Sequence, residues 1–123
     1  MRIRAYFTNE KQLQATTFAT GTSNIFSWPV PGTRISTYFH DPEYYAAMGS
    51  QHEAIDIPTP QGTSVKAAMD GYVYYILPPT EGGYSYLALK HRDGFVTVYG
   101  HLSEIDVKPY QFVKKDDVIA KSG

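Results

Sequence analysis

The chain of 123 residues is 42% apolar and 19% charged, a composition typical of one globular domain with a single core. Its 11 Lys and Arg residues nearly balance 12 Asp and Glu residues and are scattered, so we expect no nucleic-acid-binding surface. The absence of cysteine excludes disulfides, thiol catalysis and Cys-ligated zinc, and no apolar run is long enough to predict a transmembrane segment.

The first part of the chain, residues 1–24, is polar and rich in Thr, and we interpret it as a lead-in to the domain. A faint helical pattern covers only residues 9–14. The lead-in contains no apolar core of the signal-peptide type. We therefore expect residues 25–123 to form the domain.

From residue 25 onward, short segments rich in Val, Ile, Tyr, Phe and Thr alternate with Gly, Pro and Asp, a pattern that predicts an all-β domain of antiparallel sheets. The predicted strands are 34–39, 54–57, 64–68, 71–77, 84–91, 95–101, 111–113 and 117–121. No long segment keeps a helical period, and we interpret 41–51 as a loop.

A tight hairpin is predicted at Asp93-Gly94, because this dipeptide favours the positive φ angles of such turns. Residues 84–90 and 95–100 should therefore pair antiparallel. Alternation along the second strand would place Thr97, Tyr99 and His101 on one face.

The segment from His52 to Asp56 combines two side chains that can bind zinc. On a straight strand, residues four apart lie about 13 Å from each other, so the segment must bend or His52 must lie in the preceding loop. A helical turn would also bring the two together, as in helical His-Glu-x-x-His metalloproteases. We reject the helix because Pro58 and Pro60 follow at once and Gly49 lies just upstream. The motif is weak by itself.

Several motifs occur together in a fixed order: FSWPVP at 26–31, STYF at 36–39, HEAIDIP at 52–58, GTSVKAAMDGYV at 62–73, TVYGHLS at 97–103, and the segment from 113 to the Ser-Gly at 122–123. In these motifs and their order the sequence resembles the lysostaphin and LytM-type zinc metallopeptidases, which have the duplicated hybrid motif fold. The resemblance covers about four fifths of the chain, which makes it far more specific than any one motif. It implies a barrel-like or sandwich-like arrangement of the antiparallel sheets.

The resemblance further implies a zinc-dependent endopeptidase that cleaves the peptide cross-links of bacterial peptidoglycan. Its Zn²⁺ would be held by His52, Asp56 and a second histidine, with water in the fourth position. His101 matches the catalytic histidine, which would orient the water, shuttle its proton or stabilise the oxyanion. Taken without the family, His101 could equally be a half-buried strand histidine. Because peptidoglycan lies outside the cytoplasm, we expect a periplasmic or extracellular place in the cell envelope.

In the family, a His-x-His motif that supplies the third ligand follows the Ser-Gly at which the present sequence stops, Ser122-Gly123. We therefore expect a fragment that lacks the last strand region and full activity, whose open sheet edge a partner chain could complete. His40 and His91 are expected at the surface. The sequence departs from the family in two further respects. Tyr110 and Asp116 occupy turn positions where glycine is common, and Ala54 stands where the His-x-Gly-x-Asp of the family often has glycine.

Two other functions remain open. One is a non-catalytic module with a degenerate metal site, which binds the cell wall or activates another hydrolase. The other is a carrier domain, since residues 113–119 superficially resemble biotinyl and lipoyl hairpins. The carrier reading is disfavoured because it leaves His52, Asp56 and His101 unexplained.

Overall fold

The computed structural model describes residues 1–7, 26–32, 34–80 and 84–123, with side chains omitted for 5–7. Its elements in chain order are β1 (Arg2–Phe7), α2 (Pro42–Met48), β2 (Ile55–Asp56), β3 (Ser64–Lys66), β4 (Gly71–Leu77), β5 (Tyr86–Lys90), the 3₁₀ turn η1 (Arg92–Gly94), β6 (Phe95–Gly100), β7 (Leu102–Ile105), β8 (Phe112–Val113) and β9 (Val118–Ser122). Among these described elements, no helix is long and apolar enough to cross a membrane.

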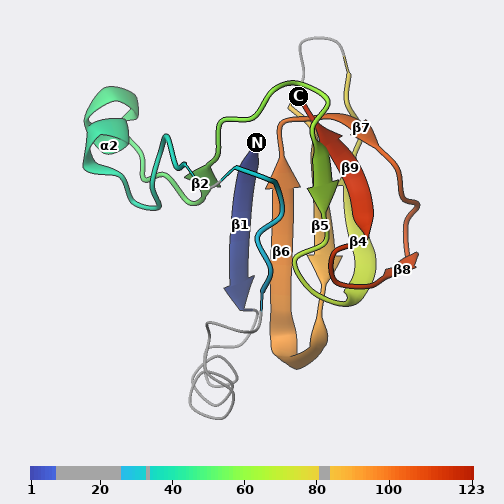
Figure 1. The fold of residues 1–123 in the computed structure, drawn as a ribbon. Coiled ribbons are helices and arrows are strands. Elements are labelled where there is room, and N and C mark those ends of the chain that lie inside the picture. The colour runs from blue at the N-terminus through green and yellow to red at the C-terminus, as the bar shows by residue number, and fades with distance from the viewer. Residues whose placement is uncertain (8–25, 33, 81–83) are drawn as a thin grey trace.

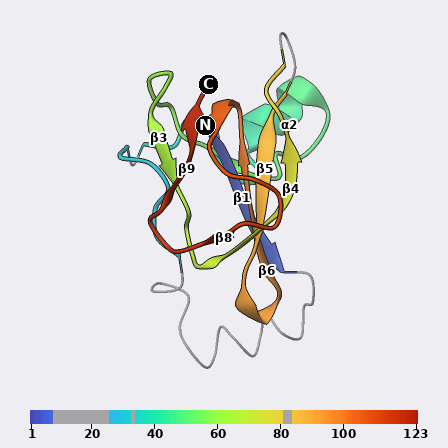
Figure 2. The same ribbon diagram turned by 90° about the vertical axis from the view of Figure 1, so that its right-hand side faces the viewer.

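The strands form two antiparallel sheets, which confirms the predicted all-β fold. The larger sheet has the order β2-β1-β6-β5-β4-β8, and the smaller has the order β3-β9-β7. In Figure 1, β1, β6 and β5 run side by side, whereas Figure 2 shows β3 and β9 apart from β4 and β5. The described strands form no closed barrel, because the larger sheet begins at β2 and ends at β8, and these two strands do not pair with each other.

The core lies between the two sheets and draws its side chains from both. Among its most deeply buried members are Val65, Val73, Leu87, Leu89, Tyr99, Ile119 and Ala120. Burial of each large side chain stabilises the fold by roughly 1.5–3 kcal/mol relative to exposure. This shared core fixes how the two sheets face each other, and through them the loops at their ends.

Most of the predicted strands are present with shorter bounds. Residues 34–39 are the exception, since Thr37 makes only an isolated bridge to Asp56 and no strand is described there. Two elements were not predicted from the sequence: β7, and the helix α2, which lies within residues 41–51 that were interpreted as a loop. The helix has readable signals: Asp41 caps its first turn by accepting hydrogen bonds from two backbone N–H groups, and Gly49 ends it at φ 76°.

The start of the chain differs from the lead-in that the sequence predicts. Residues 2–7 form β1, which pairs with β2 on one side and along its whole length with β6 on the other. Arg2 lies opposite Asp56 in the first pair and opposite Gly100 in the second. The predicted boundary at residue 24 and the faint helical pattern over 9–14 lie outside the described residues.

The predicted hairpin between β5 and β6 is confirmed. The two strands pair antiparallel, and Asp93 and Gly94 have φ angles of 60° and 79°. Left-handed backbone also occurs at Tyr110 (φ 65°) and Asp116 (φ 70°), the turn positions where the family commonly has glycine. The N–H of Asp116 donates to the carbonyl of Ala67 at 2.8 Å, so a non-glycine residue adopts this turn within a paired backbone.

The last strand of the chain is not at a sheet edge. β9 lies between β3 and β7 in the smaller sheet, so its backbone is paired on both sides. The open edge that motivated the idea of a strand-completing partner is therefore not found at β9.

Candidate functional site

His52 is held in the loop before β2, which is one of the two arrangements that its spacing from Asp56 allows. The side chain is only 2% exposed, and the ring of Tyr44 on α2 packs against it with 4.6 Å between centroids. Nδ1 lies 2.9 Å from the carbonyl oxygen of Tyr38. Because a carbonyl can only accept, Nδ1 carries the proton and Nε2 is left free to act as a ligand.

Nε2 of His52 lies 3.3 Å from Oδ2 of Asp56. Although buried, this nitrogen has no hydrogen-bond partner within the described part of the chain. An unprotonated imidazole nitrogen and a carboxylate oxygen both present lone pairs, so their approach favours a cation or a proton between them. The two residues are arranged as a pair of metal ligands would be.

Asp56 lies on β2 and is also bound by a cation from β1. Nε of Arg2 donates to its Oδ1 at 2.7 Å, and Nη2 donates to its Oδ2 at 3.0 Å. Burial by itself would raise the pKa of the Asp56 carboxyl, but the hydrogen bonds and charge of Arg2, with a smaller effect of His52, leave the pKa below its usual value. Asp56 is thus ionised near neutral pH.

His101 lies between the end of β6 and the start of β7 with a φ of 58°. Its N–H donates to the carbonyl of Ser85 at 3.0 Å, and its ring meets that of Tyr84 edge-on, 4.7 Å between centroids. Partial burial, followed by the charge of Arg2, lowers the pKa of the imidazole, so it is neutral near pH 7.

The predicted common face of Thr97, Tyr99 and His101 is wrong for the histidine. Thr97 and Tyr99 are buried in the core with their hydroxyls 2.8 Å apart, whereas His101 is exposed. The alternation ends at Gly100, because the left-handed residue that follows turns the chain.

Two hollows flank the ion pair of Arg2 and Asp56. One, of about 430 Å³, is lined by Arg2, Arg4, Tyr44, Gln51, His52, Glu53, Ala54, Tyr84, Tyr86 and Val98. The other, of about 340 Å³, is lined by Met1, Ser36, Asp56, Ile57, Pro58, His101 and Gly123. The structure therefore brings the three predicted site residues to one region of the surface.

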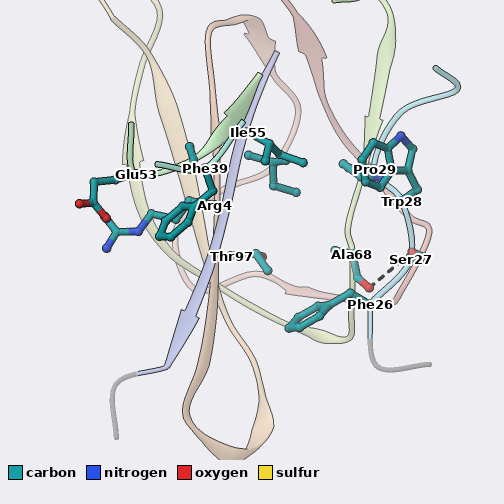
Figure 3. Close-up of a pocket in the computed structure, with 12 residues that line it drawn as sticks. Arg4, Phe26, Ser27, Trp28, Pro29, Phe39, Glu53, Ile55, Ala68 and Thr97 are labelled. Atoms are coloured by element: carbon teal, nitrogen blue, oxygen red, sulfur yellow. Dashed lines mark hydrogen bonds between the residues drawn. The ribbon is translucent and has the colours of Figure 1, made fainter. Parts of the chain in front are cut away.

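A third pocket, of about 300 Å³, has a mainly apolar lining that includes Phe26, Trp28 and Phe39 (Figure 3). None of the three predicted site residues lines it. This pocket adjoins the hollow beside His52, since Arg4, Glu53 and Ala54 line both.

The donor set at the site fits a zinc ion in part. His52 and Asp56 offer an imidazole nitrogen and a carboxylate that face each other, but in the described residues no group of three or more His, Cys, Asp or Glu could hold a metal.

The other two histidines, His40 and His91, make contacts elsewhere. The ring of His40 stacks on Phe39, and His91 hydrogen-bonds the carbonyl of Asp70 and the hydroxyl of Thr97. The expected surface position holds for His40, whereas His91 is half-buried.

Sequence reasoning missed two residues of this region. Arg2 gave no signal, because a cation in a polar segment carries no information about a partner 54 residues away. Tyr84 was assigned only to a strand, but it precedes β5 and contacts His101. Its place beside the Gly-Gly at 82–83, next to a β-rich run, was the available clue that it leaves the regular strand.

Comparison with known proteins decides the family. Residues 50–123 match the model of peptidase family M23. The chain belongs to this family. The matched region contains His52, Asp56 and His101, and the resemblance to LytM-type peptidases is confirmed.

Proteins similar to this M23 domain include both peptidases and proteins that are described by other roles. The cell division protein DipM of Caulobacter vibrioides is 35% identical over 80% of the chain and 15% of its own length. The murein hydrolase activator NlpD of Escherichia coli is 28% identical over 81% of the chain and 24% of its own length. A zinc-containing peptidase from Vibrio cholerae superposes with a TM-score of 0.70 and 31% identity, over 80% of the chain and 32% of its own. The chain thus spans less than a third of the length of each of these three proteins.

Proposed function

We propose that this M23 domain is a zinc-dependent endopeptidase that cleaves the peptide cross-links of bacterial peptidoglycan. The observation that carries the proposal is the buried Nε2 of His52. It has no hydrogen-bond partner in the described residues and lies 3.3 Å from Oδ2 of Asp56, with His101 lining the same hollow as Asp56. A purely structural histidine at this depth would be expected to use both ring nitrogens.

His52 and Asp56 would hold the metal together with a third ligand from outside the described residues. When bound, zinc supplies a Lewis acid that polarises a peptide carbonyl and lowers the pKa of a water molecule. His101, kept neutral by its lowered pKa, would accept the proton of the attacking water and hold it at its free ring nitrogen for the leaving amine. The proposed roles of all three residues follow from their chemistry and from the family.

The proposed substrate is an extended, sterically small peptide. The hollow beside His52 is lined by Tyr44, Tyr84 and Tyr86, whose rings offer apolar surface with hydroxyl tips that can bind a peptide backbone. Relatives are described as lipoproteins and as a murein hydrolase activator, which supports a place in the cell envelope. We propose a periplasmic or extracellular site of action.

The test is to measure release of soluble fragments from purified sacculi by the zinc-loaded full-length protein and its His101→Ala variant. We expect the rate to fall about 100-fold or more with the zinc content unchanged, the scale of a lost acid-base group. His40→Ala is the matched control, because the side chain of His40 lines neither hollow, and alanine keeps the backbone N–H that donates to the carbonyl of His52 at 2.7 Å, so the rate should stay unchanged. Loss of zinc in His101→Ala would show that His101 is a ligand and that the assigned roles are wrong.

A second candidate function is a non-catalytic module that binds the cell wall or activates another hydrolase. The observation in its favour is the fork of hydrogen bonds from Arg2 to Asp56, which neutralises a proposed metal ligand. It is also supported by the similarity to NlpD, a protein described as a murein hydrolase activator. For this function, sacculi would bind the full-length protein without bound zinc and without release of fragments.

A further inference from the structure

The guanidinium of Arg2 lies where a cation bound to Asp56 would be expected. Its Nε and Nη2 contact both oxygens of the carboxylate, at 2.7 and 3.0 Å. One of those oxygens, Oδ2, is also the atom that faces Nε2 of His52 at 3.3 Å. Arg2 and an ion shared by His52 and Asp56 would therefore use the same oxygen.

The two cations would oppose each other. A bidentate guanidinium neutralises the charge that makes a carboxylate a strong metal ligand, and a nearby divalent ion would repel the guanidinium. The region is partly shielded from water, with side-chain exposures of 29% for Arg2 and 23% for Asp56, so this repulsion is not fully screened. Both cations cannot be bound at full strength together.

Arg2 is placed by the sheet rather than by a chance surface rotamer. It pairs with Asp56 on β2 and with Gly100 on β6, so its backbone is fixed on both sides. Next to it, the N–H of Ile57 donates to the carbonyl of Met1 at 2.7 Å. The pairing of β1 with β2 and β6 therefore places the guanidinium of Arg2 beside Asp56.

The side chain of Arg2 can also move into an adjacent hollow. It lines the hollow of about 430 Å³ beside His52, so the guanidinium can swing away from the carboxylate without displacing the core. Release from Asp56 thus requires only a side-chain movement or the departure of β1 from the sheet.

We propose that Arg2 competes with the metal for the carboxylate of Asp56, so that an ion binds His52 and Asp56 only when the guanidinium leaves Asp56. The inference rests on the proposed function, since it takes His52 and Asp56 as metal ligands. It goes beyond that function by making the site latent, with its metal affinity set by a residue that is not a ligand.

The test is a titration of the purified full-length metal-free protein with Zn²⁺ against a chromogenic chelator, for wild type, Arg2→Met and Arg2→Met/His52→Ala. Methionine keeps an unbranched apolar stem but removes the fork. We expect Arg2→Met to bind Zn²⁺ at least about tenfold more tightly. In this variant no ion pair between residue 2 and Asp56 has to open before the metal can bind. The added His52→Ala change should abolish the gain.

Arg4→Met is the matched control. It removes a positive charge from the same strand and from the lining of the same hollow, while the pair of Arg2 and Asp56 stays in place. Its zinc affinity should change by less than about twofold, because the fork of hydrogen bonds on Asp56 comes from Arg2 and stays in place, and the loss of a more distant charge is screened by salt. An equal gain in Arg4→Met would overturn the proposal, because the effect would then be general electrostatics.

The outcomes separate the two proposals. Equal, His52-dependent zinc affinity in wild type and Arg2→Met would overturn the competition by Arg2 and leave the metal site standing. No His52-dependent zinc binding in either protein would overturn both.

A second measurement follows the wild-type protein itself, so its result does not depend on the folding of a variant. The Nε–H signal of Arg2 in the wild-type protein can be followed by ¹H–¹⁵N NMR as Zn²⁺ is added, with Arg2→Lys used only for assignment. We expect the hydrogen-bonded signal to shift toward that of a solvated arginine as the site fills. A signal that stays unchanged at saturating zinc would overturn the proposal.

Discussion

The ring of Tyr84 meets the imidazole of His101 edge-on, with 4.7 Å between centroids. Tyr84 also lies beside Tyr86 at 5.9 Å, and Tyr86 stacks on Tyr75 at 5.4 Å. A row of aromatic rings therefore leads from β4 across β5 to the proposed catalytic histidine. Such rows bind ligands through their faces and edges, and Tyr84 is 42% exposed.

We expect Tyr84→Ala to weaken binding of the protein to purified sacculi by roughly threefold to tenfold, the effect of one lost aromatic contact. Tyr84→Phe should bind almost as well, because it keeps the ring. Tyr74→Ala is the control, since Tyr74 is similarly exposed but its ring lies under the ammonium of Lys90, 4.3 Å away, outside the row. A pull-down with sacculi measures all three, and equal losses in Tyr84→Ala and Tyr74→Ala would argue against the row.

The buried hydroxyl of Tyr99 should contribute to stability. It accepts a hydrogen bond from the N–H of Ala68 at 2.9 Å and lies 2.8 Å from the hydroxyl of Thr97, and burial raises the pKa of Tyr99 to about 12. Tyr99→Phe would leave the N–H of Ala68 buried without its partner, at a cost of about 1–3 kcal/mol in the free energy of unfolding. Urea denaturation measures the loss. Tyr72→Phe, at an exposed position, should change stability by less than about 0.5 kcal/mol.

Gly71 is a position where any side chain should disrupt the larger sheet. A Cβ there would overlap the carbonyl oxygen of Lys90 and come within 2.7 Å of Nδ1 of His91. We expect Gly71→Ala to lower the free energy of unfolding by about 2 kcal/mol or more, because the backbone of β5 would have to move. Gly32→Ala is the control, since its nearest neighbour, the carbonyl oxygen of Pro58, lies 3.8 Å away. Similar losses at both positions in a denaturant titration would contradict the argument.

The half-buried His91 should make stability depend on pH. Burial lowers its pKa below the ordinary 6.5, despite the opposing hydrogen bond to the carbonyl of Asp70. The unfolded chain then binds the proton more readily than the folded one, so the contribution of His91 is fully present above pH 6.5 and is lost as the pH falls below it toward the folded pKa. His91→Gln should reduce the loss of unfolding free energy between about pH 7.5 and pH 5. An equal loss in wild type and variant would show that other groups control this pH range.

Local signals in the sequence were sufficient for the hairpin and for most strands. Asp93-Gly94 fixes the turn because its residues tolerate positive φ, and the β-rich runs on either side pair in a register that buries Leu87, Leu89 and Tyr99. The prediction failed at residues 34–39, whose β-rich composition is not matched by a neighbouring strand beyond the single bridge at Thr37. Propensity describes a residue, whereas a strand also needs a partner.

The candidate site could be predicted only as three residues and not as an arrangement. The motif order identified His52, Asp56 and His101, and the spacing of the first two required a bend. The distance of 3.3 Å between His52 and Asp56 depends on the packing of Tyr44 and on the hydrogen bond to Tyr38.

The sequence by itself determined the fold class, the family and the types of side chain that could act, because alternation, turn residues and motif spacing are local properties of the chain. Only the tertiary structure decided that β1 joins the sheet between β2 and β6 and sets Arg2 on Asp56. Pairing between strands 54 residues apart depends on which edge is left open and which faces share a core, and both are defined only after the whole sheet has formed.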